Sequence, residues 1–217
     1  MRYKIKLDGK IIQVRSENAA LTSKHPSRPL IKIIQKFEPV DRSLDYGCGK
    51  LRYTKILRGI SQRVDIVDSD IQLEREQVIY GAITSIKKHV HKNWNDVCIM
   101  NVQEFKKSAG AYDLILCANV LSAIPSKKVF FDVLVSLKKK LGKNGRCLIV
   151  NQHTNSHFTK WKLEGRRYAY GWLYKGRKGY SYFGIINKKI LKKSLSEAGF
   201  LNCQIWIEGQ STFALCS

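Results

Sequence analysis

The residues best suited to bind a ligand form one short segment, Asp45-Tyr-Gly-Cys-Gly-Lys-Leu-Arg-Tyr53. An apolar run with an acidic end leads into Gly47 and Gly49, which are separated by a single residue. Glycines at such a turn let the backbone approach a cofactor closely, and a helix that follows offers free N–H groups and a partial positive charge. We therefore expect a buried strand over 42–45, a tight turn that binds a cofactor, and a helix over 50–58.

A second acidic group follows at a spacing that suits ribose recognition. Asp68 lies 23 positions after Asp45, at the end of the apolar run Val64-Asp-Ile-Val67. At the carboxyl end of such a strand, an acidic side chain can accept hydrogen bonds from ribose hydroxyls. The alternative is a surface acid or a helix cap, since Ser69 and Asp70 also suit the start of a helix.

Together these features resemble motifs I and II of class I S-adenosylmethionine (SAM) methyltransferases. The usual motif I is Asp-x-Gly-x-Gly-x-Gly, and Leu51 stands here at the third glycine. The nicotinamide fingerprint Gly-x-Gly-x-x-Gly fits less well, because Arg52 takes its last glycine position. A later phrase, Asn119-Val-Leu-Ser-Ala-Ile124, resembles the family's motif IV region. The resemblance implies SAM as the cofactor, bound by Asp45, Gly47, Cys48, Gly49, Asp68, Ser69, Asn101, Val102, Ala118 and Asn119. For Asn101, an ordinary asparagine at a strand end is the alternative.

The same resemblance implies the fold: a doubly wound, Rossmann-like α/β domain with a seven-stranded, mostly parallel sheet whose last strand is antiparallel. Near-alternation around Asp8-Gly9 adds a β-hairpin within residues 1–16, which we expect to be an appendage to a single domain over 1–217. An inserted lid is expected at 152–186. Hydrophobic patterns predict further strands at 63–67, 96–100, 112–117, 146–150, 201–207 and 211–216, and helices at 30–37, 71–89, 126–141 and 186–198.

The lid is the expected substrate-binding segment. Residues 157–183 interleave nine aromatic side chains with seven Lys or Arg. Such a mixture can stack bases and clamp phosphates, or it can enclose a small cationic or aromatic molecule. Alternation from Tyr168 to Tyr174 equally fits a strand whose aromatic face packs on the core. The residues expected to contact substrate are Arg28, His153, Trp161, Tyr170 and Trp172. Arg28 also suits the carboxylate of the cofactor, or is one more basic surface residue. No catalytic residue is predicted.

The net charge of +22 is spread over the whole chain. Residues 1–150 carry 28 basic and 14 acidic side chains, and residues 151–217 carry 11 and 3. Such an excess favours polyanions, so RNA or DNA is the expected partner, and the alternative is a generally basic surface without a polyanionic partner.

Several classes of protein and site are disfavoured. No apolar run reaches the roughly 20 residues that span a bilayer, and no signal-peptide core is seen, so we expect a soluble, cytoplasmic protein. The six cysteines form no Cys-x-x-Cys pair, so no metal is expected and free thiols in a reducing compartment are the simpler interpretation.

We therefore predict a SAM-dependent methyltransferase acting on a nucleic acid or a nucleic-acid-associated substrate. Two alternatives stay open: methylation of a small molecule, and a non-catalytic nucleic-acid-binding protein on a methyltransferase-like fold. The chain lacks the Asn/Asp-Pro-Pro-Tyr/Phe phrase of enzymes that methylate base amino groups and the Pro-Cys pair of cytosine-C5 enzymes. The sequence gives no indication of oligomeric state.

Overall fold

The computed structural model describes residues 2–22, 26–152, 156–177 and 179–217. The chain groups into two compact units. One consists of Ala20–Leu116 and Lys140–Arg146, and we call it the glycine-loop unit. The other consists of Met1–Ala19, Cys117–Lys139 and Cys147–Ser217, and we call it the two-ended unit because it holds both ends of the chain.

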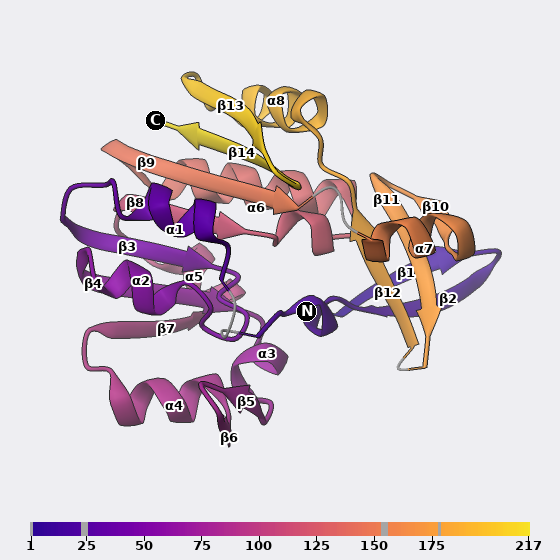
Figure 1. Cartoon of the computed structure of the whole chain (residues 1–217), viewed down its shortest axis with the longest axis horizontal. Coiled ribbons are helices and arrows are strands. Elements are labelled where there is room, and N and C mark those ends of the chain that lie inside the picture. The colour runs from indigo at the N-terminus through magenta and orange to yellow at the C-terminus, as the bar shows by residue number, and fades with distance from the viewer. Residues whose placement is uncertain (1, 23–25, 153–155, 178) are drawn as a thin grey trace. The chain divides into compact units, whose positions relative to one another are not determined.

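A seven-stranded sheet forms the framework of the fold, in the order β13-β14-β9-β8-β3-β4-β7 (Figure 1). Strand β3 pairs in parallel with β4 and β8, and β4 pairs in parallel with β7. The last strand, β14, pairs antiparallel with β9 and β13. The predicted Rossmann-like sheet is therefore confirmed. Its strands are β3 (Val40–Tyr46), β4 (Ser61–Asp68), β7 (Val97–Asn101), β8 (Tyr112–Ala118), β9 (Leu141–Gln152), β13 (Cys203–Glu208) and β14 (Ser211–Cys216).

Central strands of this sheet are buried on both faces, which explains their continuous apolar runs. Ile66 and Val67 are neighbours on β4 and point to opposite faces, yet both are fully buried. The same holds for Ile115 and Leu116 on β8. Such strands could be located from sequence because few other elements of this length are apolar on both sides.

The glycine-loop unit differs from the sequence prediction at two helices. The helix after β3 begins only at Thr54, because residues 50–53 form turns. The long helix expected over 71–89 is wrong: a short helix, a β-hairpin and a second helix replace it. The break occurs at Tyr80 and Gly81, whose φ angles of 47° and 93° make a tight turn. The elements are α1 (Arg28–Ile34), α2 (Thr54–Arg58), α3 (Asp70–Glu74), β5 (Gln77–Ile79), β6 (Ala82–Thr84), α4 (Ile86–Asn93) and α5 (Val102–Lys107).

Two long helices of the chain agree with their predicted patterns. Helix α6 (Lys127–Lys140) buries Phe130, Val133, Leu134 and Leu137, the face that periodicity predicts. Helix α8 (Lys188–Glu197) starts at Asn187, whose side chain accepts the Ile190 N–H, and Gly199 with φ of 88° follows its end. Short 3-10 turns lie at Ser16–Ala19 (η1) and Leu121–Ala123 (η2).

The strand after α6 starts earlier than expected. Strand β9 begins at Leu141, where the sequence predicted the end of a helix at 141 and a strand only from 146. A Cβ on Gly145 would lie 2.5 Å from the Tyr112 carbonyl oxygen, so this glycine permits a close backbone approach and does not mark a turn.

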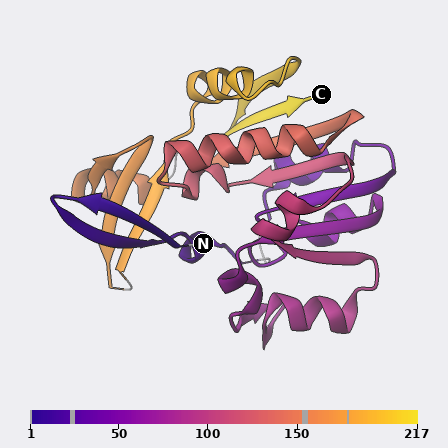
Figure 2. The same ribbon diagram turned by 180° about the vertical axis from the view of Figure 1, so that it is seen from behind.

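A second sheet joins the N-terminal hairpin to the insertion, in the order β1-β2-β12-β11-β10 (Figures 1 and 2). The hairpin itself is confirmed, but it is no separate appendage, because Val14 pairs in parallel with Tyr180. Ile5 and Val14 share a buried cluster with Leu173 and Tyr182. The elements are β1 (Arg2–Leu7), β2 (Lys10–Arg15), α7 (Ser156–Glu164), β10 (Arg166–Tyr168), β11 (Gly171–Gly176) and β12 (Gly179–Gly184).

The cysteines are only partly as expected. Cys48, Cys98, Cys117 and Cys147 are free thiols. Cys203 and Cys216 form a disulfide between β13 and β14, so the prediction of free thiols is wrong for this pair. They are opposite each other in the antiparallel register, which spacing along the chain alone does not reveal.

Among the described residues, no helix is both long and apolar enough to cross a membrane.

Candidate functional site

The loop after β3 alternates left-handed residues. Gly47, Gly49 and Leu51 have φ angles of 75°, 58° and 60°, a region that L side chains rarely adopt. The Gly47 N–H donates to the Val67 carbonyl at 2.7 Å, and the Leu51 N–H donates to the Cys48 carbonyl at 2.8 Å. We call residues 47–51 the glycine loop. Leu51 occupies the third glycine position of the motif and keeps a glycine-like backbone.

One carboxylate joins the glycine loop to the end of β4. Asp68 accepts the Gly49 N–H through Oδ2 at 3.0 Å and the Ser69 N–H through Oδ1 at 2.7 Å. Its side chain is half-buried, and burial raises its pKa while these two N–H donors lower it. The Ser69 hydroxyl donates a third, longer hydrogen bond to Oδ1 at 3.4 Å. A carboxylate has about four acceptor positions, so these three hydrogen bonds leave capacity for a ribose hydroxyl.

Asp45 lies at the end of β3 and is almost completely buried, with 3% of its surface exposed. The Thr54 hydroxyl donates to its Oδ2 at 2.6 Å. Burial raises the pKa of Asp45 to about 7, and the nearby charge of Asp68 contributes to the rise. Cys48 is also buried, and burial raises the pKa of its thiol well above the usual value. A neutral, buried thiol is a poor nucleophile.

Asn101 and Val102 follow β7, the strand beside β4. Asn101 pairs in register with Asp68, so the two residues lie at neighbouring strand ends. The side-chain oxygen of Asn101 accepts the N–H groups of Gln103 and Glu104 at 2.8 and 2.9 Å, and the Glu104 carboxylate accepts the Asn101 N–H at 2.7 Å. This capping box uses the asparagine oxygen to start α5. Its expected contact with adenine stays a prediction, as does that of Val102.

Ala118 and Asn119 belong to the two-ended unit, at the end of β8. Asn119 is left-handed, with φ of 61°, and its N–H donates to the Val150 carbonyl at 2.7 Å. Asparagine tolerates this conformation better than most residues. Both residues are half-buried, and their expected contact with the cofactor stays a prediction.

Arg28 is exposed at the start of α1. The preceding Ser27 donates its N–H to the hydroxyl of Tyr53 at 3.2 Å, so the turn before α1 lies against the residue before α2. This contact brings Arg28 close in the fold to the end of the motif I segment, and its role stays a prediction.

The predicted aromatic lid residues all take part in packing. The Trp161 ring stacks on Tyr174, with ring centroids 5.9 Å apart, and packs α7 on the sheet. Tyr170 contacts Phe130 at 5.3 Å, and the Arg167 guanidinium lies 4.3 Å from the centre of the Trp172 ring. These contacts favour the packing alternative for the aromatic face. Tyr168 and Trp172 lie on separate strands joined by a turn, so no single strand carries the alternation. His153 lies outside the described residues.

Sequence reasoning missed two side chains that support the glycine loop. The Gln72 amide nitrogen donates to the Gly49 carbonyl at 2.5 Å, and the Tyr80 hydroxyl donates to the Leu51 carbonyl at 2.6 Å. Both come from the segment that was predicted to be a continuous helix. The available signal was the Tyr80-Gly81 pair between two β-branched runs, which is weaker than the Asn-Gly signal of a tight hairpin.

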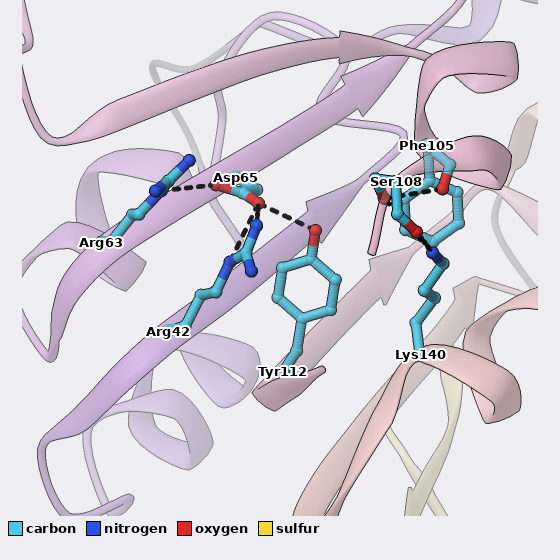
Figure 3. A network of polar contacts seen from close by, with 7 residues as sticks. All are labelled: Arg42, Arg63, Asp65, Phe105, Ser108, Tyr112 and Lys140. Atoms are coloured by element: carbon cyan, nitrogen blue, oxygen red, sulfur yellow. Dashed lines mark hydrogen bonds and ion pairs between the residues drawn. The ribbon is translucent and has the colours of Figure 1, made fainter. Parts of the chain in front are cut away.

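A network of ion pairs and hydrogen bonds around Asp65, three residues before Asp68 on β4, stabilises the seven-stranded sheet. The fully buried Asp65 on β4 accepts hydrogen bonds from Arg42, from Arg63 at 3.1 Å and from the Tyr112 hydroxyl at 2.8 Å (Figure 3). These partners lie on β3, β4 and β8, so the network joins three strands. Its carboxylate is fully used by protein donors, which gives it a structural role.

The part of the chain that the structure describes contains no group of three or more His, Cys, Asp or Glu side chains placed to hold a metal ion.

Comparison with known proteins supplies the family context. Residues 18–205 match the family model described as a methyltransferase domain. The uncharacterized protein YmfD of Escherichia coli (strain K12) is 37% identical over 202 residues, which cover 93% of this chain and 91% of that protein.

Solved structures agree on the fold. The DhpI-SAM-HEP complex has a TM-score of 0.64 at 13% identity, covering 86% of this chain and 83% of that one. The Burkholderia thailandensis 1,6-didemethyltoxoflavin-N1-methyltransferase, with bound 1,6-didemethyltoxoflavin and S-adenosylhomocysteine, has a TM-score of 0.58 at 17% identity, covering 87% of this chain and 76% of that one. At these identities the likeness establishes the fold.

Proposed function

This chain belongs to the methyltransferase-domain family and is a SAM-dependent methyltransferase, and from that premise we propose that its methyl acceptor is a small molecule. The proposal replaces the nucleic-acid substrate favoured by composition with the alternative that the sequence left open. What supports it is the chemistry of the structural neighbours together with the packing of the aromatic lid.

The residues of the glycine-loop unit fit the cofactor. The two left-handed glycines of the loop carry no side chains, so a cofactor can approach the loop backbone closely. Asp68 at the end of β4 keeps acceptor capacity for a ribose hydroxyl. Asp45 supplies a second carboxylate close to the loop, suited to a cationic ligand. SAM, when bound, supplies a methyl group attached to a positively charged sulfur, and the sulfur-containing part of SAM is the leaving group.

With such a cofactor the protein needs mainly to orient the acceptor and to exclude water. A neutral nitrogen with a free lone pair requires no general base. The loop residues therefore bind and orient the cofactor, and no residue is assigned to proton transfer.

The small-molecule proposal rests on two neighbours whose bound ligands are small. One is a complex of DhpI with SAM and HEP, and the other holds 1,6-didemethyltoxoflavin. In this chain, the rings of Trp161 and Trp172 contact neighbouring protein groups, which leaves them less available to stack nucleic-acid bases.

A nucleic-acid substrate is the second candidate, and the observation that favours it is charge. The outward-facing residues of the N-terminal hairpin include Arg2, Lys4, Lys6 and Arg15, all exposed on one face of β1 and β2. Such a face suits phosphate groups. The same face also suits the third candidate, a nucleic-acid binder without transfer activity.

Methyl transfer from isotope-labelled SAM separates these candidates. The purified protein is incubated with a low-mass metabolite extract, with total RNA and with DNA from the same cells. We expect label in the low-mass fraction. Label in RNA or DNA alone would overturn the small-molecule proposal, and label in no fraction despite SAM binding would favour the binder.

A further inference from the structure

Two residues of the glycine-loop unit that are not glycine have left-handed backbones, and a hydrogen bond joins them. Leu51 has φ of 60° and is fully buried, and Tyr80 has φ of 47°. The Tyr80 hydroxyl donates to the Leu51 carbonyl at 2.6 Å, across 29 positions of sequence. Burial raises the pKa of Tyr80 to about 12, so the hydroxyl keeps its proton and acts as the donor. Backbone strain at two joined positions points to a function for the contact.

Tyr80 is itself held in place from the other side. It forms the tip of the β5–β6 hairpin with Gly81, where Ile79 pairs with Ala82. Its ring lies 5.4 Å from the His89 ring and 6.0 Å from the Trp94 ring. The turn and the two rings therefore fix the direction of the hydroxyl, although 41% of the residue's surface is exposed.

The aromatic contacts continue to a charged pair that anchors them. The Arg58 guanidinium lies 4.7 Å from the centre of the Trp94 ring and forms two hydrogen bonds to Asp96, at 2.7 and 2.6 Å. Arg58 is the last residue of α2, the helix that follows the glycine loop. The support for Tyr80 is thus connected to the helix that follows the glycine loop.

A second support reaches the loop two residues earlier. The Gln72 side chain donates to the Gly49 carbonyl, and Gln77 on β5 accepts from the same Gln72 nitrogen at 3.1 Å. Gln77 in turn donates to the Gln72 carbonyl at 3.1 Å. The carbonyls of Gly49 and Leu51 are therefore both held by side chains of residues 72–80.

We propose that Tyr80 is a positioning residue for the cofactor, which replaces the conformational freedom of a third glycine by holding Leu51 in the left-handed conformation. A glycine at this position would adopt that backbone at little cost, whereas leucine needs an external contact to keep it. The inference rests on the function proposed above, because the loop matters only if it binds SAM.

The test compares binding of S-adenosylhomocysteine by calorimetry in the wild type and in Tyr80→Phe, which removes only the hydroxyl. Loss of one neutral hydrogen bond that shapes the loop should weaken binding about fivefold. Tyr112→Phe is the matched control, because it loses a hydroxyl bond to Asp65 in the seven-stranded sheet and leaves the glycine-loop contacts unchanged. The control should unfold at a lower temperature and bind the ligand as the wild type does. Equal affinity of Tyr80→Phe and the wild type would overturn the proposal.

The second arm asks whether Tyr80 acts through Leu51. In a Leu51→Gly background, Tyr80→Phe should change the affinity by less than about twofold, because glycine needs no support. Leu51→Asn gives the same comparison if the glycine variant does not fold, since asparagine also tolerates the left-handed region. A fivefold effect that persists in these backgrounds would overturn the role assigned to Leu51. Failure of the wild type to bind the ligand would instead contradict the proposed function.

Discussion

The carboxyl group of Asp45 is buried beside the glycine loop, and burial raises its pKa to about 7. A carboxyl with this pKa changes charge within the range where enzymes work. SAM is a cation at its sulfur, so the ionised form of Asp45 favours the cofactor and the protonated form does not.

We therefore predict that SAM affinity rises with pH. Between about pH 6 and about pH 7.5, below the usual pKa of the ligand's amino group, binding should strengthen about eightfold. Asp45→Asn should remove this dependence. Asp41→Asn, a change at an exposed aspartate of the same strand, should preserve it. Calorimetry at several pH values measures the effect, and an equal slope in Asp45→Asn and wild type would contradict it.

The same pKa predicts the stability of the ligand-free protein. The folded state binds the Asp45 proton more tightly than the unfolded state, in which the pKa of this carboxyl is near 3.8. Its stabilising contribution is therefore present at low pH and is lost as pH rises from about 4 to about 7. Urea denaturation should show that the unfolding free energy of the wild type falls relative to that of Asp45→Asn as pH rises over this range. A constant difference would exclude a raised pKa.

At the scale of single residues, the sequence predicted a tight glycine turn and an aspartate at the end of a strand, and the structure contains both, because residue type decides conformation there. Their contacts with the cofactor stay predictions. It did not reveal Gln72 or Tyr80. Their hydrogen bonds to the loop span 23 and 29 positions and depend on how an intervening hairpin folds. No local pattern carries such a contact.

Strands β3, β4 and β8 are joined by the buried carboxylate of Asp65, which three residues contact (Figure 3). Asp65→Asn should lower the free energy of unfolding by about 3 kcal/mol, because Arg42 and Arg63 then lose their counter-charge in the sheet. Asp41→Asn is the control with the same chemical change at an exposed site, and it should have little effect. Urea denaturation measures both, and equal stability of the two variants would show that the network contributes little.

The five-stranded sheet joins two segments that are far apart in the sequence. Val14 is fully buried against Leu173 and Tyr182, so Val14→Asp places a charge in that cluster. We expect proteases to cut residues 166–184 much faster in this variant. Gln13→Asp, on the exposed face of the same strand, is the control. If the two variants resist cleavage equally, the hairpin does not support the insertion.

Element positions were predictable where burial imposes a pattern, and not elsewhere. The strands at 63–67 and 112–117 are buried on both faces, and their apolar runs locate them. The helix expected over 71–89 was wrong because Val78 and Ile83 are 48% and 76% exposed, so their spacing does not follow a buried face. Pairing of Val14 with Tyr180 is set by tertiary structure and leaves no local signal.

At the scale of the whole molecule, the net charge of +22 determines how the protein binds polyanions. We predict that RNA and DNA bind with little sequence preference and that their affinity falls steeply with salt, as expected for phosphate contacts alone. SAM affinity should change much less over the same salt range. Fluorescence anisotropy with labelled oligonucleotides measures the first and calorimetry the second. Tight, sequence-selective binding that survives salt would support a nucleic-acid substrate.

We propose that the glycine loop and Asp68 together hold the cofactor. Calorimetry with S-adenosylhomocysteine tests it in the wild type, Asp68→Asn and the control Asp70→Asn, an exposed aspartate two residues away. We predict one site with a dissociation constant well below about 1 mM, about tenfold weaker binding in Asp68→Asn, and unchanged binding in the control. No binding by the wild type at about 1 mM, or equal affinity of wild type and Asp68→Asn, would contradict this role of the loop and Asp68.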